Sequence, residues 1–202
     1  MPPRIVARQL SHPNGFLGRI IRMLMNRTNA RLNAFAIRQL QLKTTDRVLE
    51  IGFGGGATLP KLLAAAASVA GLDRSRDAVE SARTRFSGII GDRTDFRQGN
   101  VEAMPFGDAS FDKALTVNTV YFWKSLDAGF AEIHRVLAPG GLLVVGFLPK
   151  DAMDRLDFPP DIFTSRTPED LTAALERSGF ANARIERPAP STRWNLIVGS
   201  RR

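Results

Sequence analysis

The sequence predicts an α/β fold in which helices cover a doubly wound, mostly parallel sheet. Three observations predict it: apolar runs of strand length alternate with segments of helical length, a glycine-rich loop follows the first apolar run, and the chain ends in two strand-like segments. Strands that alternate with helices form parallel βαβ units with right-handed crossovers. With 202 residues and a hydrophobic content of 44%, the chain suits one domain with a sizeable core.

Five short segments are expected to form the parallel part of the sheet. These strands fall at residues 47–51, 69–73, 95–98, 113–118 and 142–148. Helices are expected between them, at residues 57–67, 76–86 and 126–137. The alternation of the two kinds of segment indicates βαβ units, in which a helix crosses over the sheet between two parallel strands.

The carboxy-terminal part is expected to add one helix and a hairpin. Thr167 is suited to cap a helix over 168–178, and Gly179 is suited to end it. The segments 183–187 and 194–200 have strand character, and the short loop between them favours an antiparallel pair at the sheet edge. The predicted sheet therefore has seven strands.

The amino-terminal segment is a basic arm. Residues 1–47 hold nine of the 28 basic residues and one of the 20 acidic residues, so the net charge of +8 arises there. We divide the chain into a helical arm or lid over 1–43 and a main domain over 44–202. Within the arm, residues 16–25 are expected to form an amphipathic helix.

The arm also resembles a mitochondrial presequence, because it is arginine-rich, amphipathic and nearly free of acids. A turn at 12–15 interrupts it, however, and it continues into a segment whose apolar spacing, at Leu32, Phe35, Ala36 and Leu40, predicts a core-facing helix. No apolar run is long enough to span a bilayer. We therefore expect no cleaved leader and a cytoplasmic protein.

The composition excludes several kinds of site. There is no cysteine, which rules out a disulfide scaffold, a thiolate metal site and a cysteine nucleophile. The two histidines, His12 and His134, are too far apart in sequence for a zinc-binding HExxH pair. We expect no metal site.

The loop after the first strand is the strongest candidate for a ligand site. Glu50 lies at the end of the strand, and Gly52, Gly54 and Gly56 follow it. Glycines at the carboxyl end of a parallel strand let the backbone approach a ligand closely. Together with Ala57 the loop also matches the GxGxxA form of a dinucleotide loop, which is a weak signal when it stands alone.

Asp73 ends the second predicted strand, where its carboxylate can accept hydrogen bonds from both hydroxyls of a ribose. NAD and S-adenosylmethionine fit this role equally. The alternative is that Asp73 caps the following helix. Ser75 is at least as well placed for that cap, so we favour the ribose role.

Four blocks in the right order resemble the class I S-adenosylmethionine-dependent methyltransferases. They are VLEIGFGGG at 48–56, GLD at 71–73, QGNVEAMPF at 98–106 with SFD at 110–112, and RVLAPGG at 135–141. The blocks span roughly residues 44–200, and the type is similar to the small methyltransferases related to ubiquinone and menaquinone biosynthesis. The resemblance implies a Rossmann-like fold, S-adenosylmethionine as cofactor and S-adenosylhomocysteine as product.

The resemblance also implies roles for individual residues. Glu50 orders a loop on which the methionine part of the cofactor lies, and Asp73 holds the ribose. The backbone N–H of Val101 faces the adenine. Asn100 stands where the family usually has aspartate, and it keeps a carbonyl acceptor but loses the charge. The loop glycines in this assignment are Gly52, Gly54 and Gly56.

The segment after the fourth strand is where this fold places the methyl acceptor. Asn118 is expected to contact the methionine amine through its backbone, and Tyr121 and Trp123 are candidates for a wall of the acceptor site. Tyr121 and His12 are the candidates for a catalytic base. Ordinary packing is the alternative for these two aromatic residues, and it is the favoured interpretation for Phe122 between them. A helix cap or a turn contact is the alternative for His12. Residues 149–167 are acidic and proline-containing, and by the same resemblance they cap the acceptor pocket. Such a cap suits a cationic or neutral acceptor better than an anion, and a solvated acidic loop is the alternative.

Four functions stay open. The first, which we favour, is methylation of O, N or C on a small molecule. A nucleic-acid methyltransferase would use the basic arm on phosphates, but the arm has few aromatic residues for base stacking. A membrane-lipid methyltransferase would use the apolar face of the arm for peripheral membrane contact. The last is a NAD-binding or non-enzymatic protein. We expect a small-molecule partner and no nucleic acid, and leave the oligomeric state open.

Overall fold

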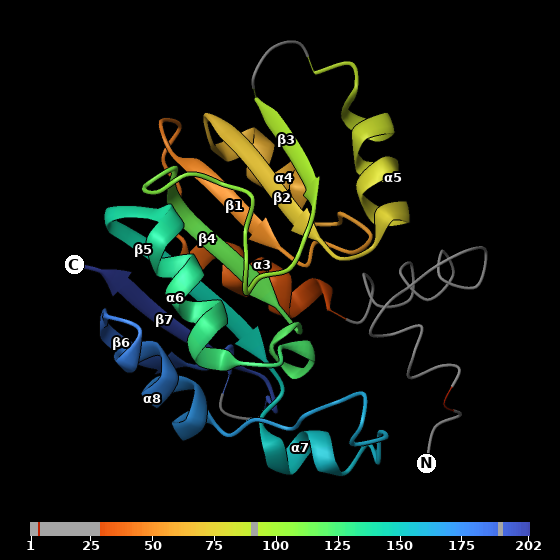
Figure 1. Ribbon diagram of the computed structural model, residues 1–202, viewed down its shortest axis with the longest axis vertical. Helices are drawn as coiled ribbons and strands as arrows, with labels where there is room; N and C mark the ends of the chain where they lie inside the picture. Colours follow the sequence, from red (N-terminus) through yellow and green to blue (C-terminus); the bar gives the residue numbers. More distant parts are fainter. Residues whose placement is uncertain (1–3, 5–28, 90–92, 190–191) are drawn as a thin grey trace.

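The computed structural model describes residue 4 and residues 29–89, 93–189 and 192–202. Their centre is a seven-stranded sheet with the strand order β3-β2-β1-β4-β5-β7-β6 (Figure 1). The strands are β1 Arg47–Ile51, β2 Ser68–Asp73, β3 Thr94–Gln98, β4 Phe111–Val117, β5 Leu137–Phe147, β6 Phe180–Glu186 and β7 Asn195–Arg201. The β5–β7 and β7–β6 pairs are antiparallel and the other pairs are parallel. The predicted Rossmann-like α/β fold with its carboxy-terminal hairpin is confirmed.

Helices cover both faces of the sheet because neighbouring residues of each central strand point to opposite sides. In β1, Val48 packs in one core with α3, α4 and α5, whereas Leu49 packs in the other with α6 and α8. The helices are α3 Ala30–Gln39, α4 Leu59–Ala65, α5 Arg76–Phe86, α6 Leu126–Val136, α7 Lys150–Asp154 and α8 Pro168–Arg177, with a 3-10 turn at Val120–Phe122.

The order of the strands creates a switch point between β1 and β4. β1 pairs in parallel with β2 on one side and with β4 on the other, so the chain proceeds outward in opposite directions from this pair. Open α/β sheets bind ligands outside the carboxyl ends of the strands at such a point. The glycine-rich loop after β1 lies there.

Several predicted boundaries differ from the structure: the strand expected at 183–187 is β6, which begins at Phe180, and the strand expected at 113–118 is β4, which begins at Phe111. Two further differences have local reasons. The helix expected at 57–67 is the shorter α4, because Thr58 is its N-cap and the residues before it stay in the glycine loop. The strand expected at 142–148 begins earlier, because Leu137 already pairs with Phe111 ahead of an irregularity in the β4–β5 register. The helix expected at 76–86 matches α5.

The core-facing helix predicted at the end of the arm is confirmed. Leu32, Ala36 and Leu40 are fully buried, and α3 contacts β4 and β5. This part of segment 1–43 therefore packs on the main domain, while the division of the chain at residue 43 stays a prediction. The predicted amphipathic helix at 16–25 and His12 lie outside the described residues. In the described part of the chain, no helix is long and apolar enough to cross a membrane.

Candidate active site

A cavity opens at the carboxyl ends of β1, β2 and β4, with about 1070 Å³ of empty space when its open mouth is included. Seven of the predicted cofactor-binding residues line it, namely Glu50, Gly52, Gly54, Asp73, Asn100, Val101 and Asn118. We call the part formed by Asp73, Asn100 and Val101 the β2 side, and the part formed by Asn29, Asn33, Val117, Asn118, Thr119 and Phe122 the β4 side. Gly56 lies in the same loop but outside the lining.

The loop after β1 needs glycine for two reasons. Gly52 has a φ of +72° and Gly54 a φ of +52°, in the left-handed region that glycine adopts without strain. A Cβ at Gly52 would also lie 2.3 Å from Cγ2 of Thr119, which follows β4. The loop thus closes tightly against the end of β4, and its backbone lines the cavity instead of side chains.

Asp73 ties together the two turns that flank the cavity. Its Oδ2 accepts a hydrogen bond from the Gly54 N–H at 2.8 Å, and its Oδ1 accepts one from the Ser75 N–H at 2.8 Å. The hydroxyl oxygen of Ser75 accepts from the Ala78 N–H and caps α5. Asp73 is therefore not the helix cap. Its carboxylate lies at the cavity wall, as the ribose role requires, and that role stays a prediction.

Glu50 is a buried carboxyl group whose hydrogen bonding is incomplete. One oxygen accepts a hydrogen bond from the hydroxyl of Thr58. The other, Oε2, has no hydrogen-bond partner within the described residues. Burial, together with the negative charge of Asp73, raises the pKa of Glu50 to about 7. An unpaired carboxylate oxygen at the wall of a cavity fits a ligand that carries a cationic or hydrogen-bond-donating group.

The turn after β3 brings Asn100 and Val101 to the cavity. The side-chain oxygen of Asn100 accepts from the Glu102 N–H at 3.3 Å. The carboxylate of Glu102 in turn accepts from the backbone N–H groups of Lys124 (2.6 Å) and Ser125 (3.0 Å), at the start of α6. The turn is thus fixed to α6 by charge-assisted hydrogen bonds.

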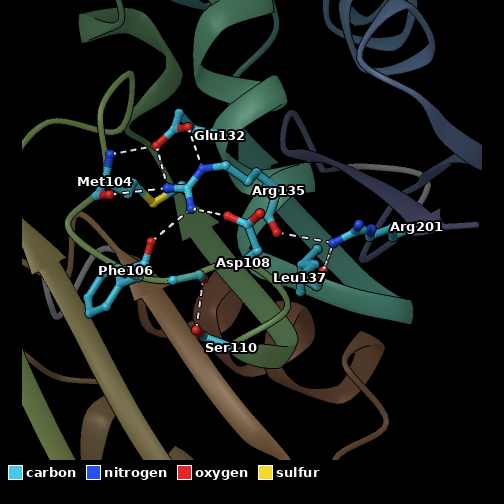
Figure 2. A network of polar contacts seen from close by, with 9 residues as sticks. Met104, Phe106, Asp108, Ser110, Glu132, Arg135, Leu137 and Arg201 are labelled. Carbon is cyan, nitrogen blue, oxygen red and sulfur yellow. Dashed lines mark hydrogen bonds and ion pairs between the residues drawn. The ribbon is translucent and has the colours of Figure 1, made fainter.

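Arg135 of α6 holds the next part of the same segment (Figure 2). Its guanidinium donates to both oxygens of Glu132 at 2.7 and 2.8 Å and to Asp108 at 2.7 Å. It also donates to the backbone carbonyls of Phe106 at 2.8 Å and Met104 at 3.2 Å. These partners raise the pKa of Arg135, whereas the guanidinium lowers the pKa of Glu132. The RVLAPGG block therefore acts through the loop that follows Val101.

Asn118 and Tyr121 form a small network behind the β4 side. Asn118 has a φ of +59°, its N–H donates to the Gly146 carbonyl at 2.8 Å, and its side-chain oxygen accepts from the Tyr121 hydroxyl at 3.2 Å. The same hydroxyl also accepts a hydrogen bond from the Leu148 N–H. Tyr121 is 3% exposed and burial raises its pKa. Its predicted roles as base and acceptor wall have no support in this geometry, because the hydroxyl supports the backbone and does not line the cavity.

Two aromatic side chains next to Tyr121 do reach the cavity. Trp123, as predicted for the acceptor wall, and Phe122 both contribute to its lining. Trp123 also packs edge-on against Phe130 at 5.3 Å. Phe122 packs against Phe163 at 4.8 Å, and Phe163 stacks on Phe158 at 4.4 Å. The segment after β5 thus joins the cavity through an aromatic cluster of Phe122, Phe158 and Phe163.

Reasoning from motifs missed several polar residues of the lining, among them Asn29, Asn33, Thr58, Arg74 and Thr119. Thr58 precedes Pro60 at a helix start, a signal that capping preferences could have found. Asn29 and Asn33 are four residues apart on one face of a helix, but nothing in their spacing says which face meets a ligand. Thr119 matters through its contact with Gly52, which only the folded chain shows.

The fold and the site define an α/β protein that binds a nucleoside-containing ligand at the switch point of its sheet. Comparisons with known proteins agree. A family model described as a methyltransferase domain matches residues 49–145. A crystal structure of an S-adenosylmethionine-dependent methyltransferase from Thermotoga maritima has a TM-score of 0.72 at 22% identity, and covers 93% of this chain and 96% of that one.

Two relatives show how far the similarity extends. The uncharacterized methyltransferase YdaC of Bacillus subtilis is 28% identical over 167 residues, which are 81% of this chain and 87% of that protein. The fatty-acid O-methyltransferase of Mycolicibacterium smegmatis is 37% identical over 115 residues, which are 56% of this chain but only 39% of that protein.

The methyltransferase-domain match and these relatives support a class I S-adenosylmethionine-dependent methyltransferase, with S-adenosylmethionine as its cofactor. The alternatives of a NAD-binding protein and a nucleic-acid enzyme are not favoured by these matches. The matches do not single out the ubiquinone-related branch of the family, so membership in that branch stays a prediction.

Proposed function

We propose that the chain transfers the methyl group of S-adenosylmethionine to an apolar, lipid-like small molecule. The observation that carries this proposal is the aromatic cluster on the β4 side. Phe122 lines the cavity and is continuous with Phe163 and Phe158 of the segment after β5. Aromatic side chains offer large apolar contact area to a ligand, so this side of the cavity suits an acyl or other hydrocarbon group.

In this proposal the β2 side holds the nucleoside. Asp73 accepts hydrogen bonds from the ribose, and the Val101 backbone faces the adenine. The backbone of Asn118 and the unpaired oxygen of Glu50 face the ammonium of the methionine part. When bound, the cofactor supplies an electrophilic methyl group on a positively charged sulfur. The protein's part is to hold the acceptor in line with that methyl group and to exclude water.

The names of relatives support an apolar acceptor. The M. smegmatis relative is named as a fatty-acid O-methyltransferase, and its matched segment shares 37% identity with this chain. Because the match covers only 39% of that protein, the acceptor class stays part of the proposal.

The test combines binding with turnover. S-adenosylhomocysteine is expected to bind and to raise the melting temperature, since a ligand that binds only the native state stabilises it. Methyl transfer from labelled S-adenosylmethionine is then measured with dodecanoic acid, dodecanol and a short polar acid such as acetate. Methylation of a twelve-carbon acceptor in preference to acetate supports the proposal. Cofactor binding with transfer only to polar acceptors contradicts the acceptor class.

A variant links the acceptor preference to the aromatic cluster. Phe163→Leu is expected to raise KM for a twelve-carbon acceptor about three- to tenfold, because it removes ring contacts while the side chain stays apolar. The affinity for S-adenosylhomocysteine is expected to stay within twofold. Phe180→Leu is the matched control, because Phe180 is equally buried but packs on His134, away from the cavity. An equal effect of the two substitutions on KM would count against the cluster.

A further inference from the structure

The first turn of α3 presents two asparagine side chains to the cavity. Leu32 and Ala36 of this helix are buried against the sheet, where α3 contacts β4 and β5. Asn29 lies three residues before Leu32, and Asn33 lies three residues before Ala36. The two asparagines are therefore next to the buried face of the helix, one turn apart. Both line the cavity, although α3 belongs to none of the blocks that resemble the methyltransferase family.

The position of α3 places this pair at the end of the cavity away from the nucleoside. The sheet order β3-β2-β1-β4-β5 separates β2, which carries Asp73, from the strands under α3 (Figure 1). Val117 and Phe122, from the segment at and after the end of β4, line the same region. The groups that meet here are therefore the methionine part of the cofactor and the reacting end of the acceptor.

The two carboxamides differ from the other polar side chains on the β4 side in their hydrogen bonding. Thr119 bonds to the hydroxyl of Thr116, and the oxygen of Asn118 accepts from Tyr121. No hydrogen bond joins the carboxamide of Asn29 or Asn33 to another group of the described residues. Each carboxamide has two N–H donors and no charge. In addition, the first turn of α3 contains no acidic residue that would balance its positive end.

We propose that Asn29 and Asn33 form a carboxylate-binding subsite at the β4 side of the cavity. The inference rests on the proposed function, because that function brings two carboxylates to this place. One is the carboxylate of the methionine part of the cofactor, and the other is that of a fatty-acid acceptor. Methyl transfer to an acceptor carboxylate would form an O–CH₃ bond and break the S–CH₃ bond, with the electron pair staying on sulfur. That transfer releases no proton, so the subsite only has to hold and orient the oxygens.

The test measures binding to the full-length chain by isothermal titration calorimetry, using Asn29→Ala, Asn33→Ala and Asn33→Asp. The ligands are S-adenosylhomocysteine, 5′-methylthioadenosine, which lacks the amino-acid part, and dodecanoate added to protein saturated with S-adenosylhomocysteine. Gln39→Ala is the matched control, because it removes a carboxamide from the same helix outside the cavity lining. Melting temperatures within about 2 °C of wild type establish that each variant is folded.

Two outcomes support the subsite and identify its ligand. If the subsite holds the cofactor, the alanine variants bind S-adenosylhomocysteine at least tenfold more weakly than wild type. Their affinity for 5′-methylthioadenosine stays within twofold of the wild-type value. If it holds the acceptor, both nucleoside ligands keep their affinity and dodecanoate binds at least tenfold more weakly. In either case Asn33→Asp has the larger effect, because a second carboxylate repels the first.

The inference is overturned if the alanine variants bind all three ligands with wild-type affinity. It is also overturned if the substitutions reduce the affinity for 5′-methylthioadenosine as much as the affinity for S-adenosylhomocysteine. Wild-type protein that binds no S-adenosylhomocysteine would overturn the proposed function itself. If only the subsite proposal is wrong, wild-type protein still binds S-adenosylhomocysteine and the variants bind like wild type. The failure of the subsite is therefore distinguishable from the failure of the proposed function.

Discussion

The two sides of the cavity are built in different ways. On the β2 side, backbone and side-chain groups are joined by short hydrogen bonds: Asp73 links two turns, and Arg135 fixes the loop that follows Val101. On the β4 side, Phe122 packs against Phe163, and the neighbouring carboxamides of Asn29 and Asn33 form no hydrogen bond with the other described residues. A hydrogen-bonded wall holds one fixed shape, whereas an apolar wall tolerates ligands of varied shape. The difference suits a site whose nucleoside never changes and whose acceptor is a hydrocarbon.

The largest expected effect comes from the point where the two sides meet. Gly52→Ala should reduce affinity for S-adenosylhomocysteine at least a hundredfold, because the new Cβ would lie 2.3 Å from Thr119 and the backbone has a positive φ. Gly54→Ala shares the positive φ but has open space around the Cβ, so its effect should be smaller. Calorimetric titration of both variants, with Gly88→Ala as control, measures the difference. Equal effects of the first two would show that the contact with Thr119 is unimportant.

A tenfold to hundredfold effect is expected for Asp73→Asn. The variant loses the charge that strengthens two backbone hydrogen bonds, and it replaces one of the two carboxylate oxygens proposed to accept from the ribose by an NH₂ donor. Because the change lies on the β2 side, the affinities for S-adenosylhomocysteine and 5′-methylthioadenosine should fall by the same factor. Asp95→Asn is the control, since Asp95 pairs with Arg97 outside the cavity. Loss of S-adenosylhomocysteine affinity alone would break the assignment of the nucleoside to this side.

Arg135→Gln tests whether the β2 side depends on support from a distance. Removing the guanidinium leaves the carbonyls of Met104 and Phe106 without these partners and should cost about 2 kcal/mol. The melting temperature should then fall by about 4–8 °C. Affinity for both nucleoside ligands should fall a few-fold, with KM for the acceptor unchanged. Arg177→Gln, which breaks an exposed pair with Asp127, is the control and should shift the melting temperature by much less. An unchanged nucleoside affinity would limit Arg135 to a stabilising role.

The same contrast explains what the sequence predicts well. The β2 side and the glycine loop next to it are encoded in local sequence patterns: Glu50 near the end of its strand, the glycines that follow, and Asp73 at the end of the next strand. Each follows from its immediate neighbours, and the structure brings them to one cavity. The seven strands were predictable for the same reason, since alternation is a local signal.

The β4 side depends on contacts between distant segments. Phe163 lies far from Phe122 in sequence, and the rotation of α3 that turns Asn33 to the cavity follows from how Leu32 packs on the sheet. Tyr121 looked like an acceptor residue by composition, yet its hydroxyl bonds the backbone of Leu148, which is 27 residues away. Contacts between residues so far apart in sequence leave no local pattern, so only the folded structure shows where these side chains lie.

The smallest expected effect concerns the protonation of Glu50, at the border of the two sides. Its pKa is raised from 4.5 to about 7 by burial, so the native chain binds a proton that the unfolded chain releases. This contribution to stability is present below about pH 4.5 and is lost as the pH rises through about 7. Binding of a cofactor ammonium near the unpaired oxygen favours the ionised form. The affinity for S-adenosylhomocysteine should therefore rise a few-fold from pH 6 to pH 8, while that for 5′-methylthioadenosine, which lacks the ammonium, should not. Glu50→Gln, titrated alongside wild type, should remove the pH dependence, and a dependence that persists in this variant would assign it to another group.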